Sequence, residues 1–140
     1  MPRSSEIAKS EQRTANSEQR KAKRMFDFEK LDVYQVVKDQ NLKVLGILKS
    51  NKEIDPYLMD QWKKASLNSL LNLAEVSGRM TETDKLYYLT IARTSVFESV
   101  AILDLLKSMN IIDPATFTEL YDGYEKSSKM LLGMYRSYTK

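Results

Sequence analysis

The sequence predicts an all-α protein, an up-down-up-down four-helix bundle preceded by a disordered basic N-terminal tail. Its 140 residues include only four Gly and three Pro, and its apolar residues recur at intervals of three and four, which is the helical period. The dipeptide Asp-Pro occurs at Asp55-Pro56 and again at Asp113-Pro114. At such a pair Asp caps a helix whose first position tolerates Pro. Four helices with short connections pack antiparallel, and the length fits one domain.

Residues 1–25 are expected to form the tail and residues 26–140 the bundle domain. The first 24 residues have almost no large apolar side chain, so they cannot offset the entropy of ordering. They hold seven basic and three acidic residues, a net charge of +4, which leaves the rest of a chain of net charge +3 at −1. The most basic part of the tail either contacts nucleic-acid phosphates or is simply solvated; it consists of Arg20, Lys21, Lys23 and Arg24.

The first two helices are expected at residues 27–50 and 56–78. The first has a stripe of large apolar residues, and the second ends at Ser77-Gly78, where Gly suits the left-handed residue past a helix end. The second helix has two unlike sides. Its polar side is formed by Gln61, Ala65, Asn68, Asn72, Glu75 and Arg79. Its apolar side is centred on Met59, Trp62, Leu67, Leu70, Leu73 and Ala74.

The third helix is expected to begin after Thr81 and to continue to about Asn110. Thr81 can cap it, and Glu82 and Asp84 lie in the first turn, where the helix dipole favours acids. Its apolar residues fall on two sides, which indicates either self-association or a wide contact with the protein's own core. One side holds Leu89, Val96, Val100 and Leu103, and the other holds Tyr88, Ile91, Ile102, Leu106 and Met109.

The fourth helix is expected from Asp113-Pro114 nearly to Lys140. Its apolar stripe is rich in aromatic residues, which we assign to the core rather than to base stacking. The stripe consists of Phe117, Leu120, Tyr121, Tyr124, Leu131, Tyr135 and Tyr138.

The composition argues against an enzyme. The chain has no Cys and no His, so it lacks thiolate ligands and the commonest general base. It also lacks a glycine-rich phosphate loop, and we expect no cofactor. An all-carboxylate metal site at Glu75 and Glu98 is a remote alternative, and no metal is expected. With no apolar run near the roughly 20 residues of a membrane span, no signal peptide and no Cys, a cytoplasmic protein is expected.

Several segments resemble the family of 23S rRNA-intervening-sequence proteins, which are small four-helix bundles. The resemblance extends from Phe28 to the C-terminus. Residues 91–98 match the family pattern Ala-Arg-Gly-Ser-x-x-Glu, although Thr94 replaces its Gly. Val76 likewise stands where relatives have Gly, and both changes predict an altered approach of helices or subunits. The other matching segments are residues 28–35, Gln61 with residues 72–79, and residues 129–132.

The resemblance implies a homo-oligomer, a ring-like pentamer in some bundles of this type. It also implies an association with RNA or with an RNA-handling partner, since a related bundle is the accessory protein of a reverse transcriptase. Two hypotheses follow. One is a non-enzymatic RNA-associated module that uses the tail and patches repeated by symmetry. The other is a protein-interaction scaffold that docks an enzyme such as a reverse transcriptase.

One set of polar residues on the second and third helices stands out. It forms either a hydrogen-bonded network that fixes the hairpin or a subunit contact, or a recognition surface, or a plain solvated face. The set consists of Asn68, Asn72, Glu75, Arg79, Arg93, Ser95 and Glu98.

Overall fold

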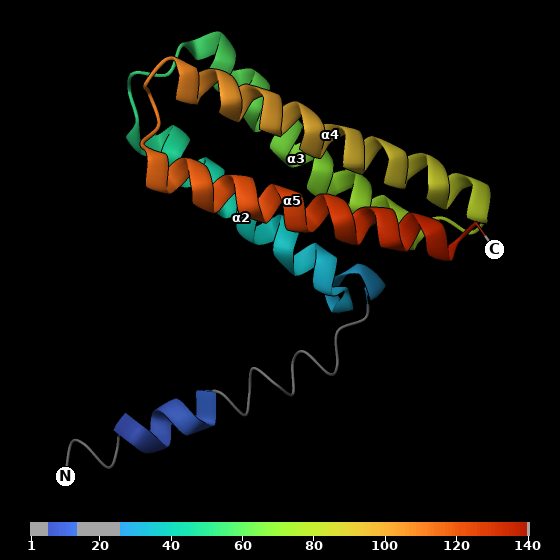
Figure 1. The fold of residues 1–140 in the computed structure, drawn as a ribbon. Helices are drawn as coiled ribbons and strands as arrows, with labels where there is room; N and C mark the ends of the chain where they lie inside the picture. The colour runs from blue at the N-terminus through green and yellow to red at the C-terminus, as the bar shows by residue number, and fades with distance from the viewer. Residues whose placement is uncertain (1–5, 14–25, 140) are drawn as a thin grey trace.

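The computed structural model describes residues 6–13 and 26–139, and in these ranges it contains helices and no strand. The all-α prediction is confirmed. A short 3-10 helix, η1, precedes four long α-helices (Figure 1). The elements are η1 (Asp27–Lys30), α2 (Asp32–Ser50), α3 (Pro56–Gly78), α4 (Glu82–Ser108) and α5 (Pro114–Ser137).

The four long helices pack as a closed square. Helix α3 packs against α2 and α4, and α5 packs against α4 and α2, while η1 lies on α2 and α3. Figure 1 shows the alternating directions, so that the start of α2 and the end of α5 lie at one end of the bundle. The expected count of four helices is incomplete, because the described residues also contain η1 and a helical segment at residues 6–13.

Within the predicted tail the structure describes residues 6–13, which form a helix of exposed residues. This segment is composed mostly of Ala, Glu, Lys, Gln and Arg, which have high helix propensity. Residues 14–25, which include the four basic residues of the predicted phosphate contact, lie outside the described residues.

Three of the predicted helix starts are confirmed by their caps. The Asp55 carboxylate accepts hydrogen bonds from the amides of Tyr57 and Leu58, and the Asp113 carboxylate accepts one from Thr116. The amide and the hydroxyl of Thr116 both donate to the Asp113 carboxylate, which holds the pKa of Asp113 below its usual range. Thr81 caps α4 in the same way. Local sequence therefore determines where α3, α4 and α5 begin.

The helix ends were predicted less well. Leu31 is extended and divides the expected first helix into η1 and α2. Gly78 does not take the left-handed conformation, which is instead found at Asn110, with φ 59°. There the amide of Ile111 donates to the carbonyl of Leu106 and that of Asn110 to Lys107. This is a Schellman motif, for which Asn is the usual substitute for Gly.

The buried face of α3 differs from the expected one. Ala65, assigned to the polar side, is only 3% exposed, and Leu67 and Leu70 are only half-buried. Relative to the expected orientation, α3 is rotated about its axis. Its small side chains face the neighbouring helices, where they permit close packing. The buried residues of α3 are Trp62, Ala65, Ser66, Ser69, Leu73 and Val76.

The broad apolar arc of α4 is explained largely by the bundle itself. Leu106, on the second side, is fully buried, and Tyr88 and Ile102 pack against the core. Only Met109 of that side is exposed. The wide core contact therefore accounts for most of the arc.

A layer of polar side chains crosses the middle of the core. In it, the indole Nε1 of Trp62 donates to the Tyr124 hydroxyl over 3.1 Å, which joins α3 to α5. Gln40 Nε2 donates to the carbonyl of Leu120 over 2.9 Å, which joins α2 to α5. We call this set the buried polar layer; it consists of Gln40, Asn41, Trp62, Ser66, Ser69, Ser95, Ser99, Tyr124 and Ser127.

Gly123 is required by this layer. A Cβ built at position 123 would overlap the Gln40 side chain, since its amide occupies that space. The absence of a side chain on α5 therefore lets Gln40 reach the Leu120 carbonyl. At the far end of the bundle, Asn51 Nδ2 donates to the carbonyl of Ile111, which links the α2–α3 and α4–α5 connections.

Replacing Tyr124 by Phe should lower the free energy of unfolding by about 1–3 kcal/mol at pH 7, because Trp62 Nε1 is left buried without an acceptor. Burial raises the pKa of Tyr124. Above the ordinary tyrosine pKa of about 10, the unfolded chain loses this proton while the folded protein keeps it, so stability falls as pH rises. Urea unfolding between pH 8 and 11.5 should show a shallower fall for Y124F. The more exposed Tyr121→Phe is the control, and an equal fall in Y124F would contradict the assignment.

Candidate functional site

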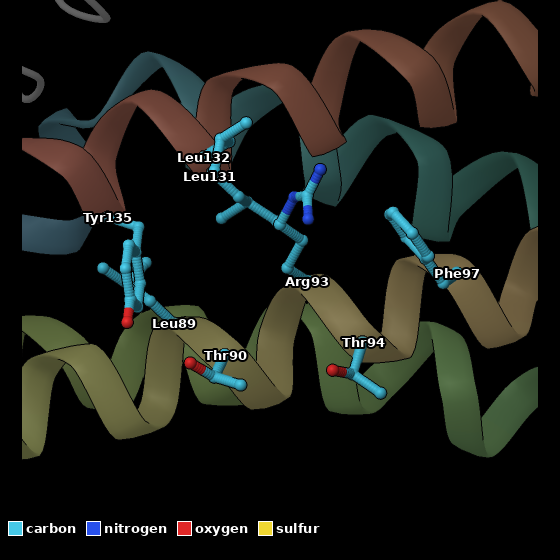
Figure 2. Close-up of a pocket in the computed structure, with 8 residues that line it drawn as sticks. All are labelled: Leu89, Thr90, Arg93, Thr94, Phe97, Leu131, Leu132 and Tyr135. Atoms are coloured by element: carbon cyan, nitrogen blue, oxygen red, sulfur yellow. The ribbon is translucent and has the colours of Figure 1, made fainter.

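A pocket of about 230 Å³ lies between α4 and α5. Figure 2 shows Arg93 crossing it from α4 toward α5, with Tyr135 and Leu89 on one side of the arginine and Phe97 on the other. We call it the Arg93 pocket. It is lined by Leu89, Thr90, Arg93, Thr94, Phe97, Leu131, Leu132 and Tyr135.

Arg93 connects the two helices. Its Nε donates to the carbonyl of Ser128 over 3.2 Å, and its guanidinium carbon lies 4.8 Å from the centre of the Phe97 ring. The side chain is half-buried. Its terminal nitrogens have no hydrogen bond, and no carboxylate forms an ion pair with it, among the residues that the structure describes.

A second hollow of about 280 Å³ continues the groove toward the start of α5. It shares Phe97 with the Arg93 pocket and is bounded on the α5 side by Tyr121, Tyr124 and Glu125. Phe97 is 54% exposed. The groove between α4 and α5 is therefore mainly apolar, with Phe97 near its middle.

The solvent side of α4 carries very little charge. Between Lys85 and Asp104 only one of the exposed residues, Glu98, is of a charged type. We call this surface the α4 outer face. Its exposed residues are Tyr87, Thr90, Thr94, Phe97, Glu98 and Ala101, and Leu105 extends it toward the end of the helix.

The predicted polar set does not form one network. On α3, Arg79 donates from Nε and Nη2 to Glu75 Oε2, and its guanidinium lies 4.4 Å from the centre of the Tyr88 ring. The contact with Glu75 raises the pKa of Arg79. Asn72 Nδ2 donates to the backbone carbonyl of Asn68. These bonds lie within α3 and at its contact with α4.

The members on α4 point in different directions. Arg93 reaches α5, whereas Ser95 is buried and donates to the carbonyl of Ile91 in its own helix. Glu98 is exposed. Residues two and five positions apart lie on different sides of a helix, so a shared motif in sequence becomes three separate environments.

No group of three Asp or Glu side chains suited to a metal ion occurs among residues 6–13 and 26–139. Glu75 is engaged by Arg79, so its carboxylate already has a cationic partner.

The comparisons with known proteins identify the family. The family model described as "23S rRNA-intervening sequence protein" matches residues 29–133. The chain belongs to this family. A comparison with curated proteins finds no match.

One solved structure with a similar fold is that of a protein of unknown function from the S23 ribosomal protein family of Bacteroides thetaiotaomicron. It superposes with a TM-score of 0.70, covers 74% of this chain and 97% of that chain, and is 16% identical in sequence. At that identity the likeness shows a common fold. Neither match suggests an enzyme.

The two departures from the family pattern have different consequences. Val76 is fully buried in the core, so its side chain acts on the approach of helices within the bundle, one of the two alternatives that the sequence left open. Thr94 is exposed at the rim of the Arg93 pocket. The Thr94 side chain therefore adds to the surface of the groove rather than to the core.

Little in the amino-acid sequence indicated the pocket. Tyr121 and Tyr135 were assigned to the core, yet Tyr121 is 42% exposed and Tyr135 lines the pocket. The available signal was Phe97 near Arg93 on a stretch of α4 whose only other charged residue between Lys85 and Asp104 is Glu98. Among the described residues, no helix is both long enough and apolar enough to cross a membrane.

Proposed function

We propose that the protein is a non-enzymatic, oligomeric helical bundle of the cytoplasm that associates with RNA. The observation that carries the proposal is the α4 outer face, with one charged residue among six exposed ones. The family's description, which refers to 23S rRNA, supports the RNA part. The basic residues of the tail supply the chemistry for that contact.

The α4 outer face supports self-association. A solvent-exposed helix face normally carries many charged side chains, whereas this one exposes Tyr87, Phe97 and Leu105. Association through it would bury apolar surface without burying many charges, which is the favourable case. A ring, such as the pentamer implied by the family resemblance, would repeat each tail around one axis.

The RNA contact depends on phosphate charge rather than on base reading. Residues 25–140 carry a net charge of −1, so the bundle itself attracts RNA weakly. Arg20, Lys21, Lys23 and Arg24 concentrate four positive charges in five residues. Repetition of such tails in an oligomer would raise the apparent affinity through effective concentration.

Self-association is tested by the mass in solution. Light scattering should give a multiple of the 16.2 kDa chain mass, and Leu105→Glu should lower it because a carboxylate would be placed on the α4 outer face. Leu42→Glu is the matched control, since Leu42 on α2 is 59% exposed and lies off this face. A monomer at high protein concentration would refute the oligomer.

RNA binding should fall steeply with salt. If four phosphates of a single strand are neutralised, raising the salt from 50 to 200 mM should weaken binding by about 50-fold. Fluorescence anisotropy with a labelled RNA would measure this. Alanine at Arg20, Lys21, Lys23 and Arg24 should abolish the salt dependence, whereas alanine at Lys63 and Lys64 on α3 should leave it. No binding to any RNA at low salt would reject the proposal.

A second candidate function is a scaffold that docks an enzyme such as a reverse transcriptase. The near-neutral bundle with exposed apolar side chains favours it, because such surfaces bind proteins more readily than phosphates. A pull-down of the candidate enzyme should then survive both RNase and 500 mM salt, and should be lost with Leu105→Glu. A complex that disappears on RNase treatment would support the RNA-associated module instead.

A further inference from the structure

The Arg93 pocket holds a cation without an anionic partner. Arg93 is half-buried, has one hydrogen bond to the carbonyl of Ser128, and pairs with no carboxylate of the described residues. Withdrawing a charge from water is unfavourable unless it is compensated. The ring of Phe97 compensates one face of the guanidinium, and the terminal N–H groups remain available as donors.

The other residues that line the pocket determine which chemical group could be attached to a bound anion. Leu89, Leu131 and Leu132 form apolar walls, and Tyr135 stands opposite Phe97 across the pocket (Figure 2). Thr90 and Thr94 place hydroxyls at the α4 rim, and the Thr90 hydroxyl donates to the carbonyl of Leu86. A guanidinium fork beside aliphatic and aromatic walls is complementary to a carboxylate joined to an apolar group.

We propose that the Arg93 pocket binds a small monocarboxylate with a short apolar body. The carboxylate accepts hydrogen bonds from the terminal nitrogens of Arg93, and the apolar part packs against Leu131, Leu132 and Tyr135. The volume of about 230 Å³ is below the roughly 300–1,000 Å³ of pockets for drug-sized ligands, which restricts the ligand to a single ring or a short branched chain.

The same chemistry has two sources, a free acid and the C-terminal residue of a peptide chain. Inorganic phosphate is a poorer fit, because a multiply charged, strongly hydrated anion needs several donors and gains nothing from apolar walls. In the pocket Arg93 is the one charged side chain. The ligand class is therefore set by the combination of one cation with a mainly apolar lining.

Titration of the full-length protein with phenylacetate tests the proposal. Binding is measured by calorimetry and by changes in the NMR chemical shifts of the Thr90, Thr94 and Phe97 amides. We expect saturable binding, at least tenfold weaker for phenylacetamide, which has the same shape without the charge. Arg93→Met should weaken phenylacetate binding at least tenfold. Arg79→Met is the matched control, because Arg79 also lies over an aromatic ring, that of Tyr88, but outside the pocket.

Peptide and phosphate arms distinguish the sources. An acetylated dipeptide that ends in leucine should bind if the ligand is a chain terminus, and its C-terminal amide should not. Phenylacetate binding without peptide binding identifies a free acid. Arg93→Lys keeps the positive charge but loses the paired N–H donors of the guanidinium. Thermal unfolding establishes that both Arg93 variants are folded. If Arg93→Met does not fold, the comparison of Arg93→Lys with the wild type and of phenylacetate with phenylacetamide tests the proposal.

The proposal is overturned if neither the acid nor the peptide binds, or if phosphate alone binds. It is also overturned if Arg93→Met lowers the mass in solution while the wild type binds no acid, since the guanidinium would then serve a contact between subunits. These results are separate from the proposed function, which is judged by the mass of the wild type and by RNA binding.

Discussion

The structure depends most on the hydrogen bond between Trp62 and Tyr124 in the middle of the core. It joins α3 and α5, which lie diagonally across the bundle, so it constrains the rotation of both helices at once. A buried indole N–H without an acceptor would be unfavourable, and the two helices must therefore keep a fixed register. The serines around it are small enough for the helices to approach closely, which a layer of leucines would prevent.

This layer also explains why α3 was predicted with the wrong rotation. A helical wheel of the apolar residues places the buried face of α3 in the mean direction of Leu67, Leu70 and their neighbours. In the structure Ser66 and Ser69 lie on the buried face instead. Periodicity weighs serine as polar and cannot register that its hydroxyl bonds to the helix backbone, as Ser69 does to the carbonyl of Ser66. Helix starts were predictable because Asp55 and Asp113 act locally, whereas burial in α3 depends on partners distant in sequence.

The candidate site was predictable only as a set of residues. The family motif brought Arg93, Ser95 and Glu98 to attention, but their separation into a groove, the core and solvent follows from the position of α4 between α3 and α5. The groove itself requires side chains from α5, about 35 residues further along the chain, and no local pattern reports such a pairing. Two neighbouring surfaces on α4, the outer face and the Arg93 pocket, share Thr90, Thr94 and Phe97.

The hydrogen bond from Asn51 to the carbonyl of Ile111 affects where the bundle opens in local unfolding. It ties the α2–α3 and α4–α5 hairpins together at one end of the bundle, so transient separation of the hairpins begins at the opposite end, where α2 starts and α5 ends. Amide hydrogens near the starts of α2 and α4 would then exchange with solvent sooner than those near their ends. The Arg93 pocket lies on the opening side of the Trp62–Tyr124 bond. Because all of its lining residues belong to α4 and α5, that is to one hairpin, such an opening would leave the pocket intact.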